Sequence, residues 1–307
     1  MPALSSDVAG QLHDFRRTSA FTARGGVVTD LDGTALHEQD GRVFVAEVVA
    51  EGLKALVDLG RPVVVNTLRF PLNVIRTFGR EWSAITRQPV PLVSLNGAMV
   101  GLLSPTGETD TTFDELAAFP LSPAEVDAAV AEIARLVDES LFDVVVFIYP
   151  RDWREGERIW TPQAERIDGL RAKYRSASEV FSGSLTALGD RLRAQGACML
   201  SVQADVPQDR RMAYQHANPS RFVTTAGVDK LSGAREAAAR LDFDLDQSVG
   251  AGDTPMDLFL TGVGLAVQVG PIPLSFEGRL ATVRLRDPAE FGAALFELAR
   301  IEAKEAS

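Results

Sequence analysis

Short apolar runs, each followed by polar residues, recur near both ends of the chain and predict buried strands. They lie at 26–29 and 62–67, from Pro91 onward, at 247–252 and at 281–285. Such runs, bounded by turn residues, are typical of strands covered on both faces. Residues 45–59 instead carry apolar side chains at helical spacing and are followed by Gly60 and Pro62, which suit the end of a helix. The first two strands and this helix therefore predict a strand–helix–strand unit with parallel strands.

The pattern changes between residues 101 and 221. Ser122, Pro123 and Glu125 form a capping box that predicts a helix through residue 139. A hairpin of strands (143–149 and 158–160), a helix (185–195) and another strand (198–204) are predicted to follow. This order indicates a separate α+β lid. We therefore expect an N-terminal extension over 1–24 with a helix near 5–17, a core domain over 25–101 and 222–307, and a cap domain over 102–221. The chain is expected to re-enter the core at 221–224 as a strand, followed by helices at 232–241 and 287–299.

Length, charge and cysteine content limit the classes of protein to which this chain can belong. The chain has 307 residues, enough for two domains of roughly 150 residues. Its formal net charge is −11 and it has no long run of Lys or Arg, which argues against a nucleic-acid partner. The single cysteine, Cys198, excludes an internal disulfide and a cysteine metal cluster. Without a signal-like segment or an apolar stretch of about 18 residues, we expect a cytoplasmic protein with no membrane partner.

Candidate chemistry lies where the predicted strands end. Asp30 and Asp32 follow the first strand, and an extended backbone would point both side chains to the same side of the sheet. Two carboxylates so close repel each other, so the site needs a cation nearby. Asp253 and Asp257 follow a later strand, and oxygen ligands at this edge suit a hard cation such as Mg²⁺.

The stretch Asp30-Leu31-Asp32-Gly33-Thr34 resembles the first motif of the haloacid dehalogenase (HAD) phosphatases. Stretches resembling the other motifs follow in the right order: Thr67-Leu68-Arg69, then Lys230, then Asp253-Thr254-Pro255-Met256-Asp257. The insertion at 102–221 is similar to the larger cap of the Cof-type sugar-phosphatase branch, subfamily IIB. The resemblance implies an α/β fold with a doubly wound, parallel-sheet, Rossmann-like core and an inserted α+β cap.

The resemblance also implies a role for each matched residue. Asp30 would be the nucleophile and Asp32 the general acid and base. The phosphate would be bound by Thr67, the backbone amide of Leu68, and Lys230. Mg²⁺ would be held by Asp30, Asp253 and the main-chain carbonyl of Asp32, with Asp257 and Thr254 in support. Asn96, Gly97 and Arg69 are candidate substrate contacts.

Plainer interpretations remain open for several of these residues. Thr67 also suits a helix N-cap, and Asn96-Gly97 is a common hairpin turn. Leu68 stands where relatives carry Gly, and Met256 stands where relatives carry Asn, so phosphate contacts at these two positions are in doubt.

The implied function is a Mg²⁺-dependent phosphomonoester hydrolase that forms an aspartyl-phosphate. Its substrate would be a small phosphorylated sugar or a sugar-glycerate phosphate. One alternative is a phosphotransferase of the phosphomannomutase type. Another is a non-catalytic sensor of a phosphate ligand, which Leu68 and Met256 would favour. The sequence leaves the oligomeric state open.

Overall fold

The computed structural model describes residues 3–39, 42–107, 110–138, 143–205 and 220–305. Its contacts divide the chain into two compact units. The first unit, called the core here, comprises Met1–Arg69, Val74–Ala117 and Val228–Ser307. The second, called the cap, comprises Phe70–Asn73 and Ala118–Gly227.

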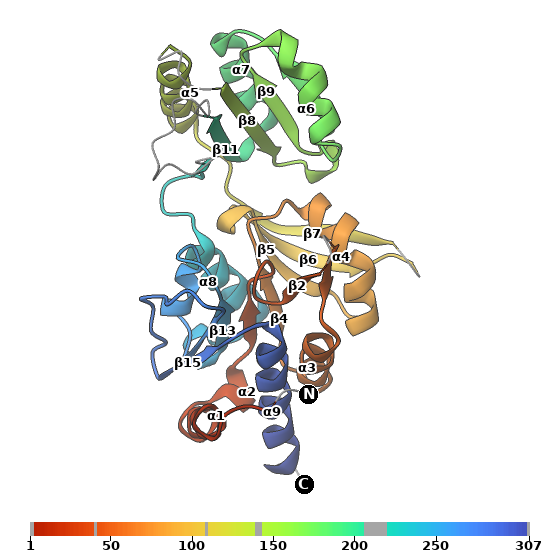
Figure 1. Cartoon of the computed structure of the whole chain (residues 1–307), viewed down its shortest axis with the longest axis vertical. Helices are drawn as coiled ribbons and strands as arrows, with labels where there is room; N and C mark the ends of the chain where they lie inside the picture. The colour runs from red at the N-terminus through yellow and green to blue at the C-terminus, as the bar shows by residue number, and fades with distance from the viewer. Residues whose placement is uncertain (1–2, 40–41, 108–109, 139–142, 206–219, 306–307) are drawn as a thin grey trace. The chain divides into compact units, whose positions relative to one another are not determined.

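An eight-stranded sheet forms the centre of the core (Figure 1). Its order is β15 (Ala281–Leu285), β14 (Leu265–Val269), β13 (Val249–Gly252), β1 (Val27–Thr29), β4 (Val63–Asn66), β5 (Val90–Ser94), β6 (Met99–Pro105) and β7 (Thr111–Ala118). The strands from β15 to β5 are mutually parallel, and β6 runs antiparallel to β5. The predicted α/β class with a parallel sheet is confirmed.

Helices cover both faces of this sheet. On one face, α8 (Lys230–Leu241) packs Ala234 and Ala237 against Val28 of β1 and Val64 of β4. The neighbours of Val64 in β4 are also buried and point to the opposite face, because side chains alternate along a strand. There α3 (Glu47–Asp58) contacts β4 and packs against α9 (Pro288–Glu305).

The remaining core elements are peripheral. Helix α1 (Ser6–Thr18) begins at the predicted place, where the Ser5 hydroxyl accepts a hydrogen bond from the backbone N–H of Val8, and it contacts α9. Helix α2 (Phe21–Arg24) leads into β1. A two-stranded hairpin, β2 (Leu36–Gln39) and β3 (Arg42–Val45), precedes α3, and α4 (Pro71–Ile85) precedes β5.

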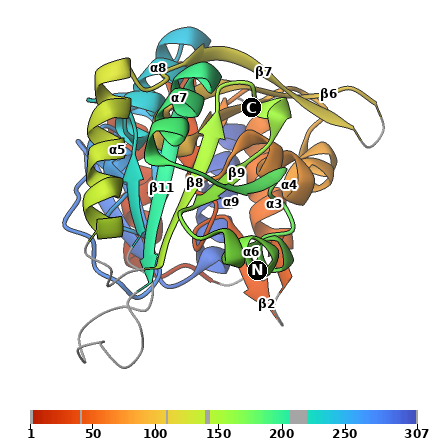
Figure 2. The same cartoon turned by 90° about the horizontal axis from the view of Figure 1, so that it is seen from above.

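The cap has its own five-stranded sheet, in the order β10 (Glu179–Ser182), β9 (Arg158–Thr161), β8 (Asp143–Pro150), β11 (Ala197–Asp205) and β12 (Ser220–Val223). Figure 2 shows helices α5 (Pro123–Asp138), α6 (Ile167–Lys173) and α7 (Leu185–Gln195) around it. Alternate residues of β8 face two different apolar clusters: Val146 packs with Leu188 of α7, and Phe147 packs with Leu170 of α6. This is the expected α+β cap.

The unit boundaries differ from those expected from the sequence. We expected the cap to begin at residue 102, but β6 and β7 extend the core sheet. We also expected residues 221–224 to re-enter the core, whereas β12 pairs antiparallel with β11 of the cap sheet. A four-residue strand has no pattern that identifies its partner, so the sequence could not distinguish these two sheets. In the part of the chain that the structure describes, no helix is both long enough and apolar enough to cross a membrane.

Candidate active site

Three acidic or hydroxyl residues follow three adjacent parallel strands of the core. Asp30 follows β1, Thr67 follows β4 and Asp253 follows β13. The strands are in register, with Val28 opposite both Gly250 and Val64, and the backbone N–H of Asp30 bonds to the carbonyl of Ala251 at 2.9 Å. Parallel strands end at the same edge of a sheet, so these residues meet there.

Lys230 reaches this edge from the first position of α8. Helix α8 begins with a capping box, in which the Asp229 carboxylate accepts from the backbone of Ser232, and the Ser232 hydroxyl accepts from the backbone of Asp229. The Lys230 Nζ atom donates to Asp30 Oδ1 at 2.6 Å and to Asp257 Oδ1 at 2.7 Å. Only 2% of Lys230 is exposed. One buried ammonium therefore lies between two buried carboxylates.

Both carboxylate oxygens of Asp257 accept hydrogen bonds. While Oδ1 accepts from Lys230, Oδ2 accepts from the backbone N–H groups of Asp253 and Thr254 at 3.0 and 2.9 Å and from the Thr254 hydroxyl at 3.2 Å. Asp257 therefore fixes the loop that carries Asp253. The adjacent Met256 places no polar side chain in this network.

The pKa values of Asp30, Asp253 and Lys230 differ from their ordinary values. Burial raises the pKa of Asp30 from its ordinary value of 3.8 to about 7; the charge of Lys230 opposes this rise, and the charge of Asp257 adds to it. Burial and the charge of Asp257 also raise the pKa of Asp253. Burial alone would lower the pKa of Lys230, but Asp30 and Asp257 outweigh it, so that this pKa is raised and the lysine stays charged.

The acidic group fits a small hard cation. Carboxylate oxygens of Asp30, Asp253 and Asp257 lie within 4.8 Å of one another. Because both oxygens of Asp257 already accept hydrogen bonds, three of them on Oδ2, Asp30 and Asp253 are the better placed carboxylates for an ion. Gly33 has φ +78°, and a Cβ atom there would lie 2.1 Å from Asp253 Oδ2, so the missing side chain leaves room for this carboxylate. Oxygen-only donors suit Mg²⁺, and the ion would offset the repulsion from Asp257 that adds to the effect of burial on both pKa values.

The side chain of Asp32 does not join this acidic group. Its carboxylate accepts two hydrogen bonds from the Arg69 guanidinium, at 2.8 Å from Nε and 2.6 Å from the Nη2 atom. The Arg69 guanidinium also lies over the ring of Phe78, 4.8 Å from its centroid. Asp30 and Asp32, which we expected to lie close together, therefore have different cationic partners: Lys230 for Asp30 and Arg69 for Asp32.

The second-motif residues form a compact turn next to β5. The Thr67 hydroxyl accepts from the backbone N–H of Arg69 at 3.1 Å, and the backbone N–H of Thr67 bonds to the Val93 carbonyl at 2.9 Å. Leu68 is partly buried.

Asn96 and Gly97 lie in a left-handed turn that joins the antiparallel strands β5 and β6, so the hairpin interpretation of this pair is confirmed. The backbone φ angles of Leu95, Asn96 and Gly97 are 52°, 57° and 96°. Two consecutive non-glycine residues in this region indicate local strain. The backbone N–H of Asn96 bonds to the Thr67 carbonyl at 3.4 Å, so this turn and the Thr67 turn support each other.

Two polar residues that the sequence does not single out hold this region together. The Ser94 hydroxyl donates to the Arg69 carbonyl at 2.6 Å, and the Asn66 side-chain amide donates to the Lys230 carbonyl at 2.9 Å. Both residues end a strand and are fully buried. Their only sequence signal is a polar residue that closes a run of valines or leucines.

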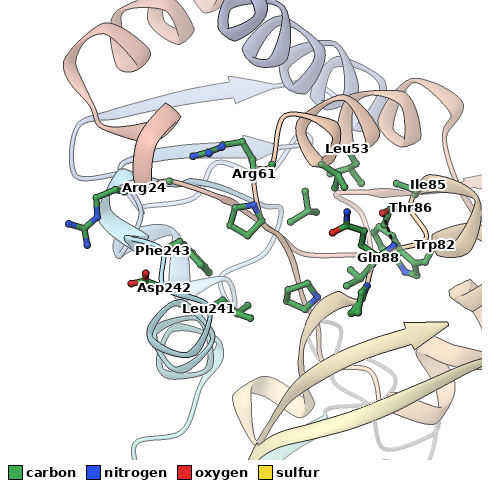
Figure 3. A pocket seen from close by; sticks show the side chains of 18 of the residues that line it. Arg24, Leu53, Arg61, Trp82, Ile85, Thr86, Gln88, Leu241, Asp242 and Phe243 are labelled. Atoms are coloured by element: carbon green, nitrogen blue, oxygen red, sulfur yellow. Dashed lines mark hydrogen bonds between the residues drawn. The ribbon is translucent and has the colours of Figure 1, made fainter. Parts of the chain in front are cut away.

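A cavity of about 360 Å³ lies elsewhere in the core (Figure 3). Its lining includes Pro62 and Val63, at the start of β4, and Val90, at the start of β5. These are the amino ends of parallel strands, whereas Asp30 and Thr67 follow carboxyl ends. The cavity therefore does not belong to the acidic site.

Comparison with known proteins gives a fold match but no sequence match. No protein-family model matches the chain, and no curated protein matches it in sequence. A phosphatase of the haloalkanoate (HAD) enzyme superfamily from Bacteroides thetaiotaomicron has a similar structure, with a TM-score of 0.63 and 16% identity over 92% of this chain and 97% of that chain.

Two further solved structures are similar. A HAD subclass IIB sugar phosphatase has a TM-score of 0.58 and 12% identity, over 92% of this chain and 99% of that one. A HAD/COF-like hydrolase from Plasmodium vivax has a TM-score of 0.63 and 16% identity, over 96% of this chain and 100% of that one. Because the coverage is nearly complete on both sides, the match includes core and cap. This chain therefore has the fold of the capped HAD phosphatases of the Cof-like, subclass IIB kind.

Proposed function

We propose that this protein is a Mg²⁺-dependent phosphomonoester hydrolase that acts through an aspartyl-phosphate on Asp30. The observation that carries the proposal is the placement of Lys230 between Asp30 and Asp257. A carboxylate oxygen of Asp253 lies within 4.8 Å of theirs, so one metal ion could bind both Asp30 and Asp253. A buried lysine among three acids at the carboxyl edge of a parallel sheet is suited to binding a phosphate dianion beside a carboxylate nucleophile. The fold shared with HAD phosphatases supports the same assignment.

The first step forms a covalent phospho-enzyme. A carboxylate oxygen of Asp30 attacks phosphorus in line, a bond forms between that oxygen and phosphorus, and the bond from phosphorus to the leaving oxygen breaks. Asp32 supplies the proton that this leaving oxygen needs. Lys230 and the Thr67 hydroxyl hold the non-bridging oxygens as charge shifts among them.

The second step returns the enzyme to its starting state. Asp32, now ionised, accepts a proton from water, and the resulting oxygen nucleophile attacks phosphorus. The bond from phosphorus to Asp30 breaks, which releases inorganic phosphate and restores the carboxylate. Arg69 would orient the ionised Asp32 that accepts the proton from water, since it contacts both of its oxygens.

Asp30 and Asp253 would hold the metal ion, together with the main-chain carbonyl of Asp32. When bound, Mg²⁺ supplies positive charge that reduces the repulsion between the Asp30 carboxylate and the phosphate. The substrate class we propose is a small phosphorylated sugar or a sugar-glycerate phosphate, because one similar structure is described as a sugar phosphatase. A cytoplasmic location stays a prediction from the sequence.

The test is phosphate release from a panel of sugar phosphates, phosphoglycerates and nucleotides, with Mg²⁺ and with a chelator. We expect release from one compound class that requires Mg²⁺ and is abolished in Asp30→Asn. Asp58→Asn, at an exposed surface ion pair, is the control that should keep activity. Transfer of the phosphoryl group without free phosphate would indicate a phosphotransferase instead. Phosphate binding without any turnover would indicate the non-catalytic sensor.

A further inference from the structure

Asn66 is the last residue of β4 and has no exposed surface. It follows three buried valines, 63–65, so an apolar residue would continue the strand without difficulty. Its Nδ2 atom donates to the backbone carbonyl of Lys230 at 2.9 Å, but its Oδ1 atom is buried with no hydrogen-bond partner among the described residues. A buried amide with one unsatisfied atom is less favourable than an apolar side chain of the same size. Packing alone therefore does not account for asparagine here.

The hydrogen bond from Asn66 joins the two elements that carry the phosphate ligands. Lys230 is the first residue of α8, and its main-chain position determines where its ammonium meets Asp30 and Asp257. Asn66 precedes Thr67 directly, so the same side chain connects the backbone of the lysine to the backbone beside the threonine. We propose that Asn66 is a positioning residue that holds Lys230 relative to Thr67; this inference rests on the proposed function.

The start of α8 is also held by close packing that does not involve Asn66. A Cβ atom on Gly97 would lie 2.1 Å from the Asp229 carbonyl oxygen, and one on Gly233 would lie 2.7 Å from the Gly97 Cα atom. The start of the helix and the left-handed turn at Leu95–Gly97 therefore lie too close together for a side chain at either glycine, and this close packing keeps the helix in place. Loss of the Asn66 hydrogen bond should therefore leave the fold intact and release only the peptide group of Lys230, which would change the direction of its side chain.

The test compares Asn66→Leu, which removes the donor and keeps the size, with Asn66→Ala, which removes it without adding bulk. Ser248→Ala is the matched control. Ser248 is also fully buried at a strand end, and its hydroxyl accepts from the backbone N–H of Gly26 at 2.9 Å and donates to the Asp244 carbonyl at 2.7 Å. It precedes β13, at the edge of the sheet opposite the acids.

We expect both Asn66 variants to fold and to lose kcat by about 10- to 100-fold, since small displacements of a positioned group have effects of this size. Binding of inorganic phosphate should weaken, whereas Ser248→Ala should lower the Tm and leave kcat unchanged. A kcat within twofold of the parent in both folded Asn66 variants would overturn the proposal. So would a loss of kcat in Ser248→Ala equal to that in the Asn66 variants.

A second readout does not depend on turnover. The chain has four lysines, Lys54, Lys173, Lys230 and Lys304, so the NMR signal of the Lys230 side-chain ammonium can be assigned with Lys230→Gln. We expect this signal to shift in the Asn66 variants and to stay in place in Ser248→Ala. An unchanged signal in the Asn66 variants would overturn the positioning role, whatever the kinetics. A shifted signal in a protein that releases phosphate from no compound would refute the proposed function and retain the positioning role.

Discussion

The guanidinium of Arg69 contacts both carboxylate oxygens of Asp32, through Nε at 2.8 Å and through the Nη2 atom at 2.6 Å. A paired contact of this kind fixes the orientation of a carboxylate as well as its position. Just over half of the Asp32 side chain is exposed, in contrast to the buried Asp30. The two aspartates of the first motif are therefore in different environments, which suits different roles in catalysis.

Asp32→Asn tests this division of roles. We expect turnover to fall by about 10²- to 10⁴-fold, the usual contribution of a general acid and base. The free energy of unfolding should change by less than about 1 kcal/mol, because an exposed ion pair contributes little to stability. Steady-state kinetics and urea unfolding measure the two effects. Asp14→Asn, which removes an exposed ion pair with Arg17, should change neither, and equal turnover of the two variants would refute the role of Asp32.

Lys230→Met tests the buried ion-pair network. It would leave Asp30 and Asp257 buried without their cation, a change of the kind that lowers the free energy of unfolding by about 3–5 kcal/mol. The loss should be larger at pH 8 than at pH 5, because Asp30, whose pKa is raised to about 7, is protonated at the lower pH and no longer repels Asp257. Urea unfolding at both pH values measures it. Lys54→Met, at an exposed pair with Asp58, should lose less than about 1 kcal/mol; a similar small loss in Lys230→Met would contradict the network.

Asp30 should make the metal-free protein less stable as the pH rises. Its pKa is raised from 3.8 to about 7 in the folded protein, mainly by burial. Between these values the folded state binds more protons than the unfolded state, so the free energy of unfolding falls with increasing pH, by at most about 1.4 kcal/mol per pH unit for one group. Its contribution is most favourable below about pH 4 and has been lost above pH 7.

The measurement is urea unfolding with a chelator at pH 5, 6 and 7. Asp30→Asn should make the free energy of unfolding depend less steeply on pH. Some dependence should remain, because burial also raises the pKa of Asp253. Asp58→Asn should leave the slope as it is in the parent. A slope that is identical in Asp30→Asn and the parent would show that Asp30 does not titrate in this range.

The sequence predicts the centre of the core because fully buried strands give continuous apolar runs. Strands β1, β4 and β13 and the residues that follow them were found in this way. Spacing does not identify the partners of these residues, since Arg69 and Asp32 are 37 positions apart and Lys230 and Asp30 are 200 apart. Lys230 is singled out as the partner of Asp30 only by the motif resemblance, and the contact between Arg69 and Asp32 is not predicted. Short strands such as β12 were assigned to the wrong sheet, because four residues do not indicate which neighbour they pair with. Asn66 was missed because its partner is a backbone carbonyl, which has no sequence signature.

Gly33→Ala tests whether the space beside Asp253 is needed for metal binding. A methyl group at this position would lie 2.1 Å from Asp253 Oδ2, so the carboxylate would have to move. Gly33 also has φ +78°, where any side chain costs about 1–2 kcal/mol. Gly60→Ala separates the two effects, because Gly60 has φ +76° with nothing within 4 Å of an added Cβ atom.

We expect both variants to lose similar stability in the presence of a chelator, measured by urea unfolding. Only Gly33→Ala should weaken Mg²⁺ binding, measured by titration calorimetry, because only there does the new methyl group displace a carboxylate that would bind the ion. Turnover at low Mg²⁺ should fall in Gly33→Ala and recover in part as the Mg²⁺ concentration is raised. Equal Mg²⁺ affinity in the two variants would show that Asp253 is not a ligand in the position that the structure gives it.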